Sequence, residues 1–133
     1  MTYYVDTSAF LKLVVHEEHS EALQAWVAGH DGELFSSDLL TTEALRTARR
    51  HSTAALGEAR RRLDALTIVR LGADVFERAA ELDPGILRTL DALHLAAALL
   101  VGDELEAIVT YDRRLADAAD LHGVQVVAPG AVD

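Results

Sequence analysis

Two aspartates stand where a short apolar run gives way to a helical pattern. Asp6 lies in the segment YVDTS (residues 4–8), and Asp112 ends the segment VTYD (residues 109–112). In open α/β sheets ligands bind beyond the carboxyl ends of the strands, so both carboxylates are placed for chemistry there. Aspartate is also a preferred residue at the start of a helix, where it accepts hydrogen bonds from free backbone N–H groups. Taken singly, each aspartate is better explained as a helix cap than as a ligand.

Two further acids are harder to assign from local pattern alone. Asp91 lies in the apolar segment LDALHLAAA (residues 90–98), in which His94 is the only other ionisable group. A buried carboxylate without a partner is energetically costly. The candidate partners are His94, an arginine from elsewhere in the chain, or a bound cation shared with other carboxylates. Glu43 lies beside the apolar face of its helix, where an ion pair with Arg46 three residues later is the ordinary explanation.

All four acids can converge at one end of one parallel sheet. Clustered carboxylates raise one another's pKa, and a hard divalent cation such as Mg²⁺ or Mn²⁺ removes this repulsion by binding their oxygens. Zinc is not expected, because the chain has no cysteine and its six histidines show no H-x₃-H spacing. We interpret His94 as a core or supporting residue, and the other histidines as surface or capping residues.

Short apolar or β-branched runs alternate with longer helical patterns along the chain. We expect strands over residues 3–5, 33–36, 67–71, 107–110 and 124–127. Helices are expected over residues 7–15, 18–29, 53–66, 73–82, 86–101 and 113–122, with a turn at residues 83–85. A further helix is expected to be capped by Ser37 or Asp38 and to carry a shared face from Leu40 to His51. This alternation predicts a parallel sheet covered by helices on both faces. The helix over 86–101 is apolar almost all round and is therefore expected to be buried.

The length of 133 residues fits a single domain spanning residues 1–133. The longest apolar stretch, residues 95–102, is far shorter than the roughly 20 residues that cross a bilayer. The absence of cysteine excludes disulfide scaffolds and thiol nucleophiles, and we expect a cytoplasmic location. The helices over 7–15 and 18–29 carry more apolar positions than one sheet face requires. We expect a protein partner to cover them, and ordinary core packing is the alternative.

The net charge of −10 argues by itself against a polyanionic partner, but the charge is unevenly distributed. Residues 41–71 contain seven arginines and three acids, a local charge of +4. Arg46, Arg49 and Arg50 are spaced to share one helix face. Arg60, Arg61 and Arg62 are expected to lie on a solvated helix, with an ion pair between Glu58 and Arg62.

Four segments of the chain together resemble the PIN-domain nucleases, and within them the VapC toxins of bacterial toxin–antitoxin pairs. The segments are VDTSA (5–9), TE (42–43), LDALHLAAA (90–98) and TYDRRL (110–115). The resemblance implies a three-layer α/β/α, Rossmann-like fold with a parallel sheet of four to five strands. It also implies a Mg²⁺-dependent endoribonuclease, in which Mn²⁺ can substitute, with an RNA substrate, a cognate antitoxin and a homodimeric state.

Carried over residue by residue, the family's acidic quartet corresponds to Asp6, Glu43, Asp91 and Asp112. Within this resemblance Asp6, Asp91 and Asp112 bind the metal, and the hydroxyls of Ser8 and Thr110 support the first and last aspartates. Such a site permits metal-assisted hydrolysis of a phosphodiester by one or two ions, with Glu43 holding a second ion or orienting the water. We expect Arg46, Arg49 and Arg50 to hold phosphates of the RNA.

Three other kinds of protein also place an aspartate in such a position or share this fold. In a phosphotransferase or phosphatase of the haloacid-dehalogenase or receiver type, Asp6 would be the nucleophile, but Ser8 replaces the second acid and Lys12 is the only lysine. A metal-dependent adhesion site of D-x-S-x-S type would need serine where Phe10 stands. An inactive partner-binding module is the third alternative, against which the intact quartet argues.

Overall fold

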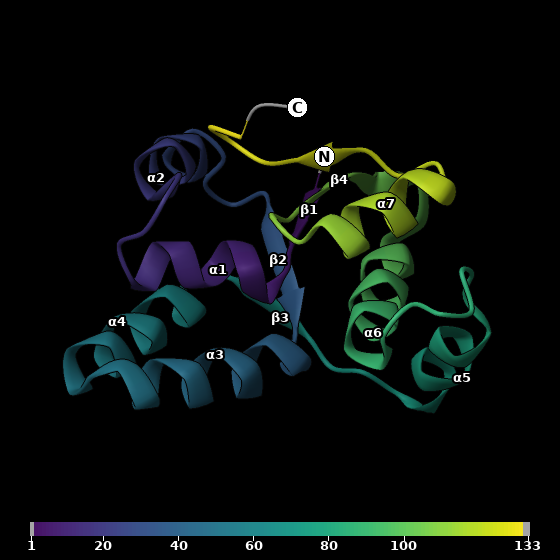
Figure 1. Cartoon of the computed structure of the whole chain (residues 1–133), viewed down its shortest axis with the longest axis horizontal. Helices are drawn as coiled ribbons and strands as arrows, with labels where there is room; N and C mark the ends of the chain where they lie inside the picture. Colours follow the sequence, from purple (N-terminus) through teal and green to yellow (C-terminus); the bar gives the residue numbers. More distant parts are fainter. Residues whose placement is uncertain (1, 132–133) are drawn as a thin grey trace.

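The computed structural model describes residues 2–131, and its centre is a five-stranded parallel sheet (Figure 1). The strands are β1 (Thr2–Val5), β2 (Leu34–Ser37), β3 (Thr67–Val69), β4 (Leu105–Val109) and β5 (Val126–Val127), in the order β3-β2-β1-β4-β5. Seven α-helices fall within these residues: α1 (Thr7–Val14), α2 (Ser20–Ala28), α3 (Asp38–His51), α4 (Thr53–Asp64), α5 (Ala73–Glu81), α6 (Thr89–Ala98) and α7 (Arg113–Leu121). The predicted parallel sheet of four to five strands is confirmed.

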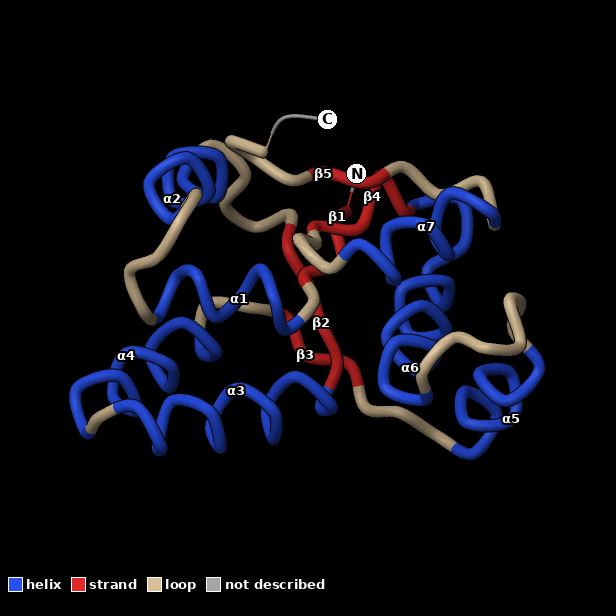
Figure 2. Tube along the Cα trace, viewed as in Figure 1, coloured by secondary structure: helices blue, strands red, loops and turns tan. Residues whose placement is uncertain are grey.

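The helices form two layers, one on each side of the sheet (Figure 2). Helices α1 to α4 lie on one side, and α5, α6 and α7 lie on the other. Successive residues of a strand point to opposite faces, so Tyr4 packs in the core beneath α6 and α7, whereas Val5 packs beneath α1 and α3. Ile108 and Val109 of β4 divide between the two cores in the same way. The predicted three-layer α/β/α fold is therefore confirmed.

One predicted helix begins later than its apolar pattern indicates. Helix α6 starts at Thr89 rather than at residue 86, and a 3₁₀ segment, η1 (Leu99–Glu104), follows it. The backbone N–H of Leu87 donates to the carbonyl of Pro84 at 2.9 Å and closes a turn that excludes these residues from the helix. Ile86 is consequently 93% exposed, and Leu100 in η1 is 43% exposed, so the expectation of a buried helix over the whole of 86–101 was wrong at both ends.

Strand β1 occupies the middle of the sheet and sets the position of the site. From β1 the chain proceeds to β2 and β3 on one side, and it later returns to β4 and β5 on the other. The loops that follow β1 and β4 therefore diverge at the carboxyl edge, which is where open α/β sheets bind ligands. Asp6 and Asp112 both lie in these loops. Between residues 2 and 131, no helix is long and apolar enough to cross a membrane.

Candidate active site

Asp6 is nearly completely buried, with 3% of its surface exposed, at the junction of β1 and α1. One carboxylate oxygen, Oδ1, accepts from the backbone N–H of Ala9 at 2.9 Å and so caps α1. The other, Oδ2, accepts from Thr110 Oγ1 at 2.5 Å, and Ser8 Oγ lies 2.8 and 3.0 Å from the two oxygens. Burial raises the pKa of the Asp6 carboxyl, and the hydrogen bonds from Thr110 and Ala9 oppose this rise.

These contacts leave Asp6 able to accept one more partner. A carboxylate offers about four lone-pair positions. Within residues 2–131 only three protons reach them, because the single hydroxyl proton of Ser8 is shared between both oxygens. Asp6 is therefore a helix cap, as its local sequence indicated, and it also lines the pocket described below.

The two carboxylate oxygens of Asp112 also have different partners, a helix terminus and an arginine. Its Oδ1 accepts from the backbone N–H groups of Arg114 at 2.8 Å and Leu115 at 3.2 Å, which caps α7. Its Oδ2 lies 3.6 Å from Nη2 of Arg88. The Thr110 hydroxyl that donates to Asp6 also accepts from the backbone N–H of Asp112 at 3.0 Å. One threonine thereby ties the loops after β1 and β4 together.

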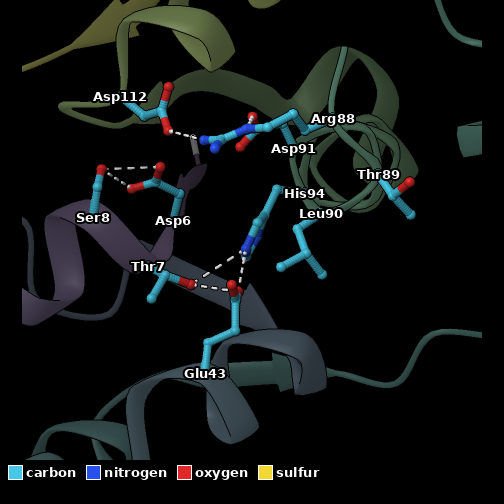
Figure 3. A pocket seen from close by; sticks show the side chains of 10 residues that line it. All are labelled: Asp6, Thr7, Ser8, Glu43, Arg88, Thr89, Leu90, Asp91, His94 and Asp112. Atoms are coloured by element: carbon cyan, nitrogen blue, oxygen red, sulfur yellow. Dashed lines mark hydrogen bonds and ion pairs between the residues drawn. The ribbon is translucent and has the colours of Figure 1, made fainter. Parts of the chain in front are cut away.

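Asp91 lies in the first turn of α6 and is 8% exposed. Its Oδ2 lies 3.4 Å from Nε of Arg88, three residues earlier, so its partner is this arginine rather than His94. Burial, and next the negative charge of Asp112, raise the pKa of the Asp91 carboxyl, whereas Arg88 acts to lower it. The guanidinium of Arg88 thus lies between two carboxylates, while its side chain is 61% exposed (Figure 3).

Glu43 is the half-buried end of a chain of hydrogen-bonded polar groups that crosses the sheet. Its Oε1 accepts from Thr7 Oγ1 at 2.6 Å and lies 2.7 Å from Nε2 of His94. The other ring nitrogen of His94 lies 2.7 Å from the hydroxyl of Tyr4, which is in turn 2.9 Å from Ser37 Oγ. Every buried polar side-chain atom in the described part of the chain has a hydrogen-bond partner. His94 is therefore the supporting residue that the sequence suggested.

The predicted ion pair between Glu43 and Arg46 is not formed in this structure. Glu43 faces the sheet and is half-buried, whereas Arg46 is exposed on the outer side of α3. Burial acts to raise the pKa of the Glu43 carboxyl, but hydrogen bonds from His94 and Thr7 outweigh it, and the net pKa is lowered. Glu43 is accordingly an ionised group in a fixed orientation.

These side chains line one cavity of about 330 Å³ at the carboxyl edge of the sheet (Figure 3). Its lining consists of Asp6, Thr7, Ser8, Glu43, Arg88, Thr89, Leu90, Asp91, His94 and Asp112. All four predicted acids are present, but Glu43 is turned to His94 and Thr7, while Arg88 lies between Asp91 and Asp112. Among residues 2–131, no three acidic or histidine side chains are clustered tightly enough to hold one ion as they stand.

The three arginines expected to hold phosphates are exposed on α3. Arg50 lines a second cavity of about 560 Å³, together with Lys12, His51 and Tyr111. Ser8 lines both cavities, so the two adjoin. Elsewhere, the predicted pair between Glu58 and Arg62 is confirmed at 3.1 Å, and Arg61 contacts the same glutamate at 2.6 Å.

Sequence reasoning missed three members of the site, namely Thr7, Tyr4 and Arg88. Thr7 adjoins Asp6, and its hydroxyl side chain was a usable signal. Arg88 lies one helical turn before Asp91, a spacing typical of helical ion pairs. Tyr4 gave no signal, because an aromatic residue in an apolar strand predicts core packing.

The PIN-domain family model matches residues 3–121. Ribonuclease VapC47 of Mycobacterium tuberculosis is 38% identical over 133 residues, covering 97% of this chain and 98% of the relative. Ribonuclease VapC46 of the same species is 39% identical over 126 residues, covering 95% and 96%. This chain belongs to the PIN-domain family, in its VapC group.

Solved structures agree with the fold of this PIN-domain protein. A toxin–antitoxin complex from Klebsiella pneumoniae superposes with a TM-score of 0.76 at 20% identity, over 98% of this chain and 100% of the other. VapC20 of Mycobacterium tuberculosis, a toxin that cleaves the sarcin–ricin loop, superposes with a TM-score of 0.74 at 19% identity, over 96% and 100%. The family resemblance drawn from the four sequence segments is confirmed.

Proposed function

We propose that the protein is a Mg²⁺-dependent endoribonuclease and the toxin of a toxin–antitoxin pair. The observation that carries this proposal is the cavity at the carboxyl edge of the sheet, which Asp6, Asp91 and Asp112 line together. Asp91 and Asp112 already face a positive group there, the Arg88 guanidinium. Relatives at 38–39% identity over nearly the whole chain are named ribonucleases.

The donor groups suit a hard divalent cation. Asp6 has one acceptor position left, and Asp91 and Asp112 each direct Oδ2 toward Arg88. Oxygen ligands of this kind suit Mg²⁺, or Mn²⁺ in its place, and not Zn²⁺. Asp6, Asp91 and Asp112 are therefore the proposed metal-binding residues. When bound, such an ion polarises the phosphate and lowers the pKa of a coordinated water.

Glu43 completes the proposed catalytic set by orienting the attacking water. Both of its hydrogen bonds within the described chain are made through Oε1, so Oε2 can accept a proton of that water. A general base works best when its pKa lies near the working pH. Because the pKa of Glu43 is lowered instead, its fixed orientation contributes more than its basicity.

Arg46, Arg49 and Arg50 are the proposed contacts to the RNA backbone. They lie on the helix that carries Glu43, and Arg50 lines the cavity that adjoins the acidic one. Positive side chains along such a path position phosphates without reading sequence. They would hold the strand while the scissile phosphate reaches the aspartates.

An antitoxin and a second copy of the chain are the proposed protein partners. Similar structures include a toxin–antitoxin complex and a VapBC2 complex from Rickettsia felis bound to promoter DNA. Among residues 2–131, the large exposed apolar side chains lie outside α1 and α2, contrary to our expectation, because those helices turn their apolar positions inward. Phe76, Ile86 and Leu90 are among the exposed ones, and Leu90 also lines the acidic cavity. Sedimentation at micromolar concentration tests the dimer, since a monomer alone would contradict it.

The phosphatase alternative is not supported by the surroundings of Asp6. Lys12, the only lysine, contacts Glu17 at 3.3 Å and lies over the ring of Tyr111. It is therefore engaged away from the first aspartate, where a phosphotransferase would require it.

Cleavage of RNA by the Asp91→Asn variant tests the proposal. Purified protein is incubated with total RNA and, separately, with an aromatic phosphate ester, each with Mg²⁺ or EDTA. We expect Mg²⁺-dependent cleavage of RNA only, reduced at least 100-fold by Asp91→Asn, a loss of the size typical of removing one key electrostatic group. Asp117→Asn, at an exposed carboxylate of α7, is the matched control and should cleave normally. Cleavage at the wild-type rate by a folded Asp91→Asn variant would refute the assignment.

A further inference from the structure

Arg88 occupies the position between Asp91 and Asp112 in which a metal ion would be shared. Its Nε lies 3.4 Å from Oδ2 of Asp91, and its Nη2 lies 3.6 Å from Oδ2 of Asp112. The two carboxylates come from different elements, α6 and the loop before α7. A single guanidinium therefore bridges two segments more than 20 residues apart in sequence.

The two contacts that the Arg88 guanidinium makes with Asp91 and Asp112 are long and therefore weak. Both distances exceed the 2.7–2.9 Å of a strong charge-assisted hydrogen bond. The Arg88 side chain is 61% exposed, and residue 88 is the extended N-cap residue of α6, whose side chain makes no capping hydrogen bond. Rotation of the side chain into solvent breaks two long contacts and no other hydrogen bond formed within residues 2–131.

A divalent ion shared by Oδ2 of Asp91 and Oδ2 of Asp112 would need the space that the Arg88 guanidinium occupies, and its positive charge would repel the guanidinium. The Arg88 guanidinium lies between the carboxylate of Asp91, which is nearly buried, and that of Asp112. It brings one positive charge to these two acidic side chains, whereas a divalent ion would bring two. Because Oδ2 of Asp91 and Oδ2 of Asp112 both face the guanidinium, an ion bound by these two oxygens competes with Arg88 for one position.

We propose that Arg88 is a built-in competitor of the catalytic metal, holding Asp91 and Asp112 in the metal-free protein and leaving them when a divalent ion binds. This inference rests on the proposed metal site of the preceding section. Arg88 is thus a positioning residue, whose first effect is on metal affinity rather than on the chemical step. Its exposed side chain, once released, remains at the mouth of the cavity.

Direct titration of Mn²⁺, followed through the paramagnetic resonance signal of the free ion, tests the competition without any RNA. Arg88→Gln removes the charge, and we expect it to bind Mn²⁺ about three- to tenfold more tightly, the factor that corresponds to two partly exposed ion pairs. Arg88→Lys keeps the charge and should remain close to the wild type. Arg78→Gln removes one charge from an exposed position of α5 outside the cavity, and should leave the affinity unchanged.

The outcomes separate this inference from the proposed function. Equal or weaker Mn²⁺ binding by folded Arg88→Gln, with clear binding by the wild type, would overturn the competition and leave the metal site standing. Tighter binding by Arg78→Gln as well would show a general charge effect and would also overturn it. If neither the wild type nor Arg88→Gln binds Mn²⁺, the proposed metal site is wrong, and the proposed competition by Arg88 is refuted as well.

Discussion

Replacing His94 by Phe should destabilise the protein by breaking the polar chain that crosses the sheet. The imidazole is buried and contacts the Glu43 carboxylate and the Tyr4 hydroxyl, each at 2.7 Å. Phenylalanine is close to histidine in shape but offers neither contact. The change therefore removes hydrogen bonds while leaving little empty space in the core.

The expected loss follows from the two contacts. A hydrogen bond to a charged group contributes about 1.5–3 kcal/mol, and one between neutral groups about 0.5–1.5 kcal/mol. The partners are not wholly orphaned, because Tyr4 keeps Ser37 at 2.9 Å and Glu43 keeps Thr7 at 2.6 Å. We therefore expect a decrease of about 2–4 kcal/mol in the free energy of unfolding, a large part of the roughly 5–15 kcal/mol of a typical domain.

Urea unfolding in EDTA, followed by circular dichroism, measures this loss. Glu43→Gln and the double variant complete a thermodynamic cycle, whose coupling free energy we expect to be about 1–2 kcal/mol, because the two side chains share a charged hydrogen bond. Tyr4→Phe is a control that removes the hydroxyl and keeps the contact between His94 and Glu43. A loss below about 0.5 kcal/mol for His94→Phe, or additive effects of the two substitutions, would refute this reasoning.

The pH dependence of the free energy of unfolding tests the direction of the Glu43 pKa shift independently. Its pKa in the folded protein is lowered, so its ionised form stabilises the fold at pH values above the ordinary glutamate pKa of about 4.3. This contribution is lost as the pH falls through the lowered value. Glu43→Gln should therefore destabilise the protein at pH 7 and much less in acid below pH 4. A difference that grows on acidification would contradict the assigned shift.

Two further predictions concern metal and RNA. Millimolar Mg²⁺ or Mn²⁺ should raise the melting temperature, by the equivalent of about 2.7 kcal/mol when the ion is in hundredfold excess over its dissociation constant. Asp6→Asn should abolish this rise. A melting temperature that neither ion changes would count against the site. In a cleavage-inactive background, the logarithm of the RNA-binding constant should fall with the logarithm of the salt concentration with a slope near −2, because about three phosphates are neutralised. Replacing Arg49 and Arg50 together by Ala should make this slope shallower. An unchanged slope would place the RNA elsewhere.

The sequence by itself determined the fold class and the places where chemistry is possible. Alternation of short apolar runs with helical patterns predicted the parallel sheet, because strand and helix periodicities are local properties of the chain. Asp6 and Asp112 were located at strand ends for the same reason. Their capping hydrogen bonds, to Ala9 and to Arg114 and Leu115, lie within three residues and could also be anticipated.

The tertiary structure alone decided how the acids are partnered. The helical spacing of Glu43 favoured Arg46, but folding places His94, 51 residues away, within 2.7 Å and turns Arg46 to solvent. Likewise the spacing of Arg88 allows a contact with Asp91, whereas its second contact, with Asp112, depends on how α6 packs beside β4 and α7. Long-range contacts of this kind arise from the packing of whole elements, so no local pattern specifies which two side chains will meet.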